Sequence, residues 1–201
     1  DYYIYTEKRQ SRQKFFTTQL EHLFLLAREQ NQDPLTLKGS YAGAMGWGQF
    51  MPNSYRNYAI DYDNDGLADI WTNATDAIGS VANYFTEHGW IKDQPVATRV
   101  LVSENFDVSD LNKMRRPKLS ISDLKAKGFQ PVTNYTQDYK AFPILLAGKY
   151  GDEYWLGLHN FYVIGRYNPR IKYAMAVYQL SLSIGGRYCE SNDTCKPTQT
   201  P

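Results

Sequence analysis

The amino-acid sequence predicts an α+β protein with a mainly helical core, a small α/β insert and one EF-hand-type loop. Apolar residues recur at helical spacing in the segments 12–30, 75–88 and 169–186. Residues 95–158 instead contain alternating β-branched residues and a hairpin signal. Residues 61–72 carry aspartates at alternate positions, as in a calcium-binding loop. Together these three observations give the fold class.

At 201 residues, the chain is long enough for one sizeable core, or for a core and a small subdomain. We expect three parts: core helices with the cation loop in 1–94, the α/β insert in 95–165, and a returning helix with a tail in 166–201. The net charge of +1 gives no electrostatic basis for binding nucleic acid. No apolar run approaches the ~20 residues of a membrane span.

The helix expected over 12–30 has apolar residues at three- and four-residue spacing, and Asp33-Pro34 stops it. These residues are Phe15, Phe16, Leu20, Leu23, Phe24 and Ala27. In the helix over 75–88, one apolar stripe contains Ile78, Val81, Ala82 and Phe85. In the helix over 169–186, we expect Ala174, Val177, Leu180 and Ile184 to face inward.

The α/β insert begins with a strand in the segment PVATRVLVSE. A short helix follows, capped by Ser120 or Ser122 and ended by Gly128. The segment 140–158 is then typical of a hairpin that turns at Gly151-Asp152.

The aspartates of DYDNDGLADIWT match an EF-hand loop at positions one, three, five and nine, with glycine at six. These are Asp61, Asp63, Asp65 and Asp69, with the carbonyl of Leu67 at position seven. Position twelve is Thr72 instead of a bidentate Glu, and Asp76 can serve in its place. Because hard cations prefer oxygen ligands, the loop predicts a structural Ca²⁺ or Na⁺ site. The alternative is an Asx-turn loop without metal.

The preceding stretch, GSYAGAMGWGQF, contains four glycines beside Ser40, Tyr41, Gln49 and Phe50. Small residues let a long ligand approach the backbone, the Gln amide both donates and accepts, and the rings offer flat faces. A groove for a polysaccharide or a peptide is one interpretation. Close glycine packing within the protein is the other. The 17 tyrosines allow the same two interpretations, stacking on sugar rings or packing in a half-wet core.

Cys189 and Cys195 lie six residues apart in a polar, turn-rich tail. Such a pair favours a small surface disulfide and an oxidising compartment such as the periplasm. Two free thiols are the alternative.

Three blocks of the sequence resemble the membrane-bound lytic transglycosylase B family, in the same order, between about residues 14 and 186: LKGSYAGAMGWGQFMPNSY, DAIGSVANYFTEHGW and NFYVIGRYNPRIKYAMAVYQL. The resemblance implies a lysozyme-like core and a periplasmic monomer. It also allows association with the outer membrane through a lipid anchor outside this chain. The implied reaction cleaves the β-1,4 bond between N-acetylmuramic acid and N-acetylglucosamine in peptidoglycan and leaves a 1,6-anhydromuramoyl end.

The resemblance also implies the site residues. It places Asp76 at the last acidic ligand of the loop, and it assigns substrate contacts to Ser40, Gln49, Phe50, Met51, Tyr84, Asn160, Tyr162, Arg166 and Tyr167.

In this family one Glu acts first as acid and then as base, in a short motif upstream of the helix that starts near Arg12. The sequence shows no such motif, so no catalytic residue is assigned, and neither Glu7 nor Glu21 takes that role. We therefore expect either a lytic transglycosylase seen in part or a non-catalytic peptidoglycan-binding fragment. A calcium-regulated interaction protein is disfavoured because there is only one such loop.

Overall fold

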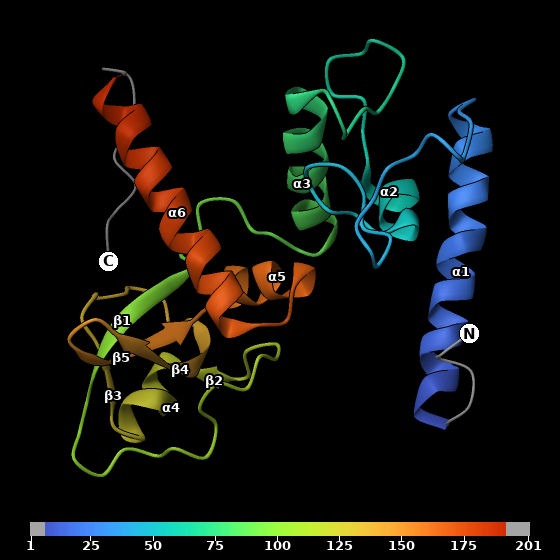
Figure 1. Cartoon of the computed structure of the whole chain (residues 1–201). Helices are drawn as coiled ribbons and strands as arrows, with labels where there is room; N and C mark the ends of the chain where they lie inside the picture. The colour runs from blue at the N-terminus through green and yellow to red at the C-terminus, as the bar shows by residue number, and fades with distance from the viewer. Residues whose placement is uncertain (1–6, 192–201) are drawn as a thin grey trace. The chain divides into compact units, whose positions relative to one another are not determined.

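The computed structural model describes residues 7–191, with side chains from residue 12 onward. The chain forms two compact units, residues 1–87 and 88–201, which are described here one at a time. The structure confirms the α+β class, because helices dominate the first unit and a sheet with three helices forms the second (Figure 1). The three-part division expected from the sequence stays a prediction. Among the described residues, no helix combines the length and apolar character that crossing a bilayer requires.

The first unit contains α1 (Glu7–Glu29), α2 (Pro52–Tyr58) and α3 (Ala74–Glu87). Two loops, 30–51 and 59–73, join them and carry much of the buried core. The side chains at the centre are less than one-tenth exposed: Leu26, Ala27, Met45, Phe50, Tyr55, Ile70, Ala77 and Tyr84. An ion pair also joins α1 to α2, with Arg56 Nη2 and Glu29 Oε1 2.6 Å apart.

Helix α1 forms where the sequence predicts it, but most of its apolar stripe is exposed. Phe15, Phe16, Leu20 and Phe24 are each about half exposed, whereas Ala27 is buried. Among the described side chains of α1, the buried ones are Gln19, Leu26 and Ala27, and α2 packs against this helix. The Gln19 side chain accepts a hydrogen bond from the backbone N–H of Asn53, at the start of α2.

The buried face of α3 differs from the predicted stripe. Ile78, a member of the predicted apolar stripe, is 71% exposed, whereas Asp76, Ala77 and Tyr84 are buried. The rotation has a physical cause: the Asp76 carboxylate binds backbone amides of the acidic loop, and the Tyr84 ring packs against Phe50. A polar anchor and one large ring therefore decide which face of α3 is buried.

The second unit is built on an antiparallel sheet with the strand order β2-β4-β5-β1-β3. The strands are β1 (Ala97–Val102), β2 (Leu119–Ser120), β3 (Phe129–Pro131), β4 (Lys140–Gly148) and β5 (Gly151–Gly157). The predicted hairpin forms, but its turn is wrong by two residues. Gly148 pairs with Gly151, so the turn is Lys149-Tyr150. Gly151 has φ +129°, a conformation that favours glycine, directly after this turn.

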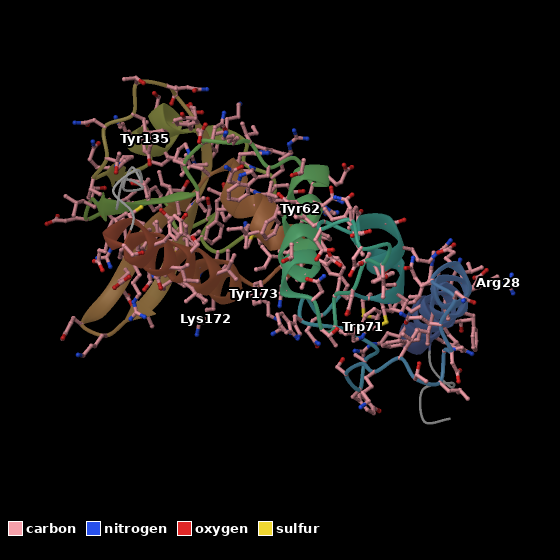
Figure 2. All side chains as sticks on the ribbon, turned by 90° about the horizontal axis from the view of Figure 1, so that it is seen from above. Arg28, Tyr62, Trp71, Tyr135, Lys172 and Tyr173 are labelled. Atoms are coloured by element: carbon pink, nitrogen blue, oxygen red, sulfur yellow. The ribbon has the colours of Figure 1, made fainter. Side chains whose placement is uncertain are left out.

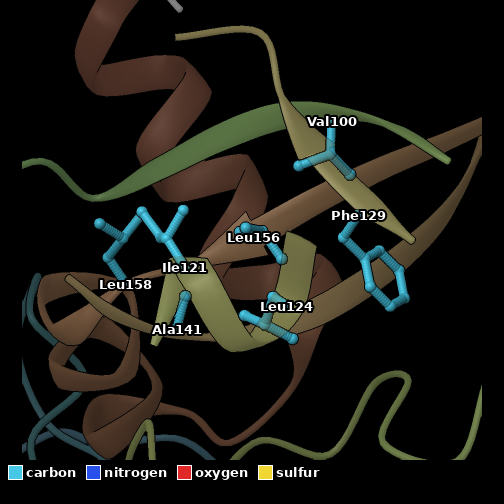
Figure 3. Packing of buried hydrophobic residues seen from close by; sticks show 7 residues of the cluster. All are labelled: Val100, Ile121, Leu124, Phe129, Ala141, Leu156 and Leu158. Carbon is cyan, nitrogen blue, oxygen red and sulfur yellow. The ribbon is translucent and has the colours of Figure 1, made fainter. Parts of the chain in front are cut away.

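Helix α4 (Ile121–Ala126) packs on one face of this sheet. Ser120 is its N-cap and forms a capping box with Asp123, which decides between the two serines that the sequence offered. Gly128, with φ +90°, follows the end of the helix as predicted. Figure 3 shows the resulting core cluster: Val100, Ile121, Leu124, Phe129, Ala141, Leu156 and Leu158.

Helices α5 (His159–Tyr167) and α6 (Ile171–Glu190) complete the second unit. Ala174 of α6 is buried as predicted, but Leu180 and Ile184 are about 60% exposed, so their predicted inward orientation is wrong. The C-terminal half of α6 extends beyond the sheet (Figure 1), and Ile184 lies in this half, with Leu180 directly before it. The last buried side chain of α6 is Tyr178, whose hydroxyl donates to the carbonyl of Ala97, and burial raises its pKa to about 12.

Candidate functional site

The glycine and aromatic stretch forms a tight, irregular loop in the first unit. Met45 forms isolated bridges with both Gly39 and Phe50, and Met45 and Phe50 exchange backbone hydrogen bonds of 2.8 and 3.0 Å. Gly46 is required here for two reasons. Its φ is +62°, and a Cβ at this position would lie 2.5 Å from the carbonyl oxygen of Ile70. The neighbouring Trp47 N–H donates to the same carbonyl at 2.9 Å, so the loop is attached to the end of the acidic segment.

The predicted substrate residues of this loop have unequal exposure. Ser40 and Gln49 are exposed, Met51 is half-buried, and Phe50 is only 2% exposed. Gln49 has a left-handed backbone, φ +52°, and its Nε2 donates to the carbonyl of Gly46 at 3.0 Å. The loop therefore holds the Gln49 carboxamide at the surface, directly beside the glycines.

Tyr84 of α3 lies underneath this loop. Its ring centroid is 5.9 Å from that of Phe50 and 4.9 Å from that of Tyr58, the latter in an edge-to-face arrangement. Phe50 and Tyr84 therefore support the loop from below, and the same loop presents Ser40 and Gln49 to solvent.

The remaining predicted residues lie on α5, in the second unit. Asn160 is fully buried, and its carboxamide bonds three backbone groups of the segment before β1: Ile91 N–H at 3.0 Å, Ile91 C=O at 2.8 Å and Gln94 C=O at 3.1 Å. Tyr162 is half-buried with its ring 6.5 Å from that of His159, Arg166 is exposed and Tyr167 is half-buried. Asn160 thus has a structural role in the second unit, because it holds the segment before β1.

The acidic loop gathers four carboxylates. Oxygen atoms of Asp61, Asp63, Asp65 and Asp76 all lie within 4.8 Å of one another. Backbone amides orient three of them. Asp61 accepts from Asp65 N–H at 3.1 Å and from Gly66 N–H at 2.8 Å, and Asp65 accepts from Leu67 N–H at 3.0 Å. Asp76 accepts from two further backbone N–H groups of the loop. Four acidic side chains converging on one point suit a hard, oxygen-preferring cation, so the donor set fits calcium.

Asp69 lies outside this cluster. Its carboxylate accepts from the backbone N–H groups of Trp71 and Thr72, at 2.8 and 2.9 Å, and from the Thr72 hydroxyl. Burial acts to raise the pKa of Asp69, but these hydrogen bonds outweigh it and hold the pKa below its usual value. The carbonyl of Leu67 accepts a hydrogen bond from Asp69 N–H at 2.9 Å. Asp69 therefore closes the end of the loop, and its predicted place as a ligand stays a prediction.

Sequence reasoning missed two residues that support the loop. Asn73 Nδ2 donates to the Asp63 carboxylate at 2.8 Å. Trp71 Nε1 donates to the carbonyl of Lys38 at 3.0 Å, and its ring packs on Tyr55. Figure 2 labels Trp71 and Tyr62, which lie near the two ends of the loop. A cavity of about 330 Å³ adjoins this region, lined in part by Trp71 and Lys38. The sequence signal for Asn73 and Trp71 is the segment DIWTN, which continues the loop with polar and aromatic residues.

Cys189 lies in the last turn of α6, and Cys195 lies outside the described residues. The disulfide predicted between them therefore stays a prediction.

Comparison with known proteins finds similarity over residues of both units. The family model described as "Transglycosylase SLT domain" matches residues 3–182. Membrane-bound lytic murein transglycosylase B of Escherichia coli (strain K12) is 46% identical over 173 residues, which cover 86% of this chain and 46% of that protein.

Solved structures of lytic transglycosylases are also similar to this chain. The structure of the Escherichia coli lytic transglycosylase Slt35 in complex with calcium is 45% identical with a TM-score of 0.77, and the match covers 85% of this chain and 53% of that chain. SltB3 from Pseudomonas aeruginosa in complex with NAG-anhNAM-pentapeptide is 34% identical with a TM-score of 0.76, covering 87% of this chain and 47% of that chain. The chain thus spans about half the length of these relatives.

Proposed function

Because the chain belongs to the transglycosylase SLT-domain family, we propose that it acts in a peptidoglycan lytic transglycosylase. The reaction breaks the bond between C1 of N-acetylmuramic acid and the O4 of the next N-acetylglucosamine. The oxygen of the C6 hydroxyl of the same muramic residue bonds to C1 and closes the 1,6-anhydro ring. The departing O4 takes one proton from an acid, and the C6 hydroxyl gives one proton back. No water is consumed, in contrast to ordinary glycoside hydrolysis.

The exposed Gln49 carboxamide is the observation that carries this proposal for the first unit. It is held beside the glycines, where a sugar can approach the backbone, and it can bond an acetamido group as both donor and acceptor. Ser40 offers a hydroxyl from the same loop. Phe50, Met51 and Tyr84 give the loop its apolar support.

In the second unit, we propose that α5 supplies further substrate contacts. Tyr162 and Tyr167 offer aromatic rings for sugar faces, and Arg166 offers a guanidinium for carbonyl or carboxylate oxygens. Asn160 contributes indirectly, because its buried carboxamide holds the segment that precedes β1. The acid that serves O4 is a Glu in this scheme, and we assign it to no side chain within residues 12–191.

We further propose that the acidic loop binds Ca²⁺, or Na⁺, as a structural ion in an EF-hand-type arrangement. Asp61, Asp63, Asp65 and Asp76 supply carboxylates, with Leu67 and Asp69 completing the set. A related structure was solved in complex with calcium, which supports this assignment. The ion would stabilise the substrate loop indirectly, because Ile70, at the end of the acidic loop, accepts the hydrogen bond of Trp47.

The same proposal implies a partner, a cellular compartment and an oligomeric state. Peptidoglycan strands are the partner, the compartment is the periplasm, and a lipid anchor outside this chain would attach the protein to the outer membrane. We expect a monomer, with Cys189 paired to Cys195 in that oxidising compartment.

The test is digestion of purified sacculi by the purified chain, with the soluble products analysed by mass spectrometry. The proposal requires muropeptides one water lighter than the hydrolytic products. Products of hydrolytic mass would contradict it. Retention of the protein on sacculi without any release would favour the non-catalytic peptidoglycan-binding fragment.

A further inference from the structure

A short basic segment of the second unit lies between β1 and β2. Residues 112–118, NKMRRPK, form the basic strap, and they contain Lys113, Arg115, Arg116 and Lys118. The strap belongs to the yellow-green loop of Figure 1. Four cations within six residues are usually a solvated surface feature. In this protein, however, several contacts hold the strap in one position.

The first residue of the strap is attached to β4, beyond the two residues of β4 that pair with β2. Asn112 N–H donates to the carbonyl of Pro143 at 3.0 Å. Its Nδ2 donates to the carbonyl of Leu145 at 3.0 Å, and its Oδ1 accepts from the N–H of Leu145 at 2.9 Å. One asparagine thus satisfies three strand-edge groups, and its left-handed backbone, φ +57°, turns the chain at that point.

The rest of the strap is attached through its apolar residues and its C-terminal end. The thioether of Met114 lies against Gly165 of α5, so closely that a Cβ there would be 2.5 Å from the sulfur. Pro117 is buried. Directly after the strap, Leu119 and Ser120 pair with Ala141 and Lys140 of β4. The strap is therefore held beside α5, the helix that carries Tyr162 and Arg166.

The positive charge of the strap is poorly compensated. Asp110 pairs with Arg115 at 2.6 Å and with Lys113 at 3.5 Å. In the part of the chain that the structure describes, the exposed side chains of Arg116 and Lys118 have no acidic partner within ion-pair distance. Lys140 adds a further cation, since its Nζ donates to the carbonyl of Lys118 at 3.1 Å. The Asp123 carboxylate, in the capping box with Ser120, interacts with Lys140 and offsets part of this charge. The strap thus presents a net positive surface.

We propose that the basic strap binds the carboxylates of the peptide stems on a peptidoglycan strand, an inference that rests on the proposed function. A stem carries several carboxylates close to the glycan backbone, and fixed ammonium and guanidinium groups beside α5 are complementary to them. A strand that contacts α5 would then place its stems over the strap. The strap makes stem-bearing strands the preferred ligand.

An anionic lipid surface is the competing partner, and the strap fits it less well. Proteins that bind the membrane interface combine basic residues with apolar side chains that enter the acyl boundary. The two apolar residues of the strap, Met114 and Pro117, are turned into the protein. What remains exposed is almost purely cationic.

The test compares the chain with an Arg116→Gln/Lys118→Gln variant in binding two soluble glycan preparations. One carries peptide stems, and the other has had its stems removed by an amidase. We expect the parent to bind stem-bearing strands about tenfold more tightly than stem-free strands, since two exposed ion pairs contribute on that order. The double variant should lose this preference while its affinity for stem-free strands stays the same. Raising the salt concentration should reduce the preference of the parent.

A Lys92→Gln/Lys149→Gln variant is the matched control, because it removes two exposed cations of the same unit that are not part of the strap. It should keep the stem preference. An unchanged preference in the Arg116→Gln/Lys118→Gln variant would overturn the inference. So would an equal loss of affinity for both strand preparations, or strap-dependent binding to phosphatidylglycerol vesicles without a stem preference. Failure to form anhydro products with the stem preference intact would count against the proposed function alone.

Discussion

The Asp76 Oδ1 atom accepts a hydrogen bond of 2.8 Å from the backbone N–H of Tyr62, which lies fourteen residues earlier in the chain. The other oxygen of the same carboxylate accepts from Asp69 N–H at 2.9 Å. Asp76 is fully buried, so one side chain of α3 joins both ends of the acidic loop. Two contributions to the stability of the acidic loop can therefore be tested separately. One is the set of hydrogen bonds that Asp76 accepts, and the other is the proposed ion.

Removing the ion should lower the free energy of unfolding by an amount that grows with the logarithm of the ion concentration over its dissociation constant. Calcium at one hundred times its dissociation constant adds about 2.7 kcal/mol to the free energy of unfolding, which appears as a rise in Tm. Asp63→Asn should abolish this rise while leaving the metal-free Tm nearly unchanged, because the exposed Asp63 side chain bonds only Asn73 among the described residues. Calorimetry with calcium and with a chelator measures both values.

Asp76→Ala is the contrasting variant. It should lower the metal-free stability as well, by about 2–4 kcal/mol, because two backbone amides lose their acceptor. Identical Tm values for the parent with calcium and with chelator would disprove the cation site.

Two glycines of the substrate loop should respond differently to alanine. Gly43 and Gly46 both have positive φ, but a Cβ at Gly43 meets nothing within 4 Å, whereas one at Gly46 would lie 2.5 Å from the Ile70 carbonyl. Gly43→Ala should cost about 1 kcal/mol for the backbone conformation alone. Gly46→Ala should cost several-fold more, because the loop must separate from Ile70. Urea unfolding gives both values, and equal losses would contradict the packing described here.

Gln49 should matter for cleavage more than for folding. The informative substitution is Gln49→Asn, because asparagine keeps the carboxamide and is favoured by the left-handed backbone at φ +52°. The shorter side chain cannot reach the same acceptor and donor positions, so release of anhydro products from sacculi should fall at least about tenfold. The Tm should change by only a degree or two.

Tyr41→Ala is the control for Gln49, since Tyr41 is 97% exposed on the same loop and the family resemblance assigns it no substrate contact. It should retain most of the activity. Full activity in the Gln49→Asn variant would remove Gln49 from the proposed groove.

Asn160→Ala should destabilise the second unit. Its removal leaves one N–H and two carbonyl groups of Ile91 and Gln94 without their partner, at a cost of about 2–4 kcal/mol. Asn160→Asp should be no better, because it replaces the donating amide by an acceptor facing two carbonyls. Chemical denaturation measures this loss. An unchanged unfolding midpoint would show that the buried carboxamide is not the clamp inferred from its hydrogen bonds.

The ion pair of Asp107 and Lys127 should make stability depend on pH at both extremes. The Lys127 ammonium holds the pKa of Asp107 well below its usual value of 3.8, and Asp107 in turn raises the pKa of Lys127 above 10.5. The Asp107 contribution is therefore present above pH 3.8 and is lost as the pH falls further. The Lys127 contribution is present below pH 10.5 and is lost as the pH rises through its folded-state pKa.

The corresponding experiment compares the Tm of the parent and of Asp107→Asn across the pH range. The difference should be constant at neutral pH and shrink at both extremes. Lys127→Met should give the same profile, because it removes the other half of the same pair. A difference that stays constant down to the lowest pH would show that the pair does not contribute.

Local sequence patterns predicted several features that the structure bears out. The α+β class and the positions of the long helices followed from apolar spacing. Ser120 and Gly128 bound α4 as capping preferences predict. The alternate aspartates predicted a convergence that the structure contains, with Asp76 joining Asp61, Asp63 and Asp65. The helix positions and the caps depend on residues within about one or two turns of chain, where covalent geometry and hydrogen-bond chemistry leave few choices.

Features that depend on distant partners were not predictable in this way. The exposed Ile78 and Ile184 show that periodicity identifies a helix without deciding which face finds a core. The shape of the glycine loop depends on Ile70, and the buried state of Asn160 depends on the segment before β1. By itself, the sequence determined the elements, the clustering of aspartates in the acidic loop and the family resemblance. Only the tertiary structure decided burial, support and orientation, because those depend on atoms that the chain brings together from far apart.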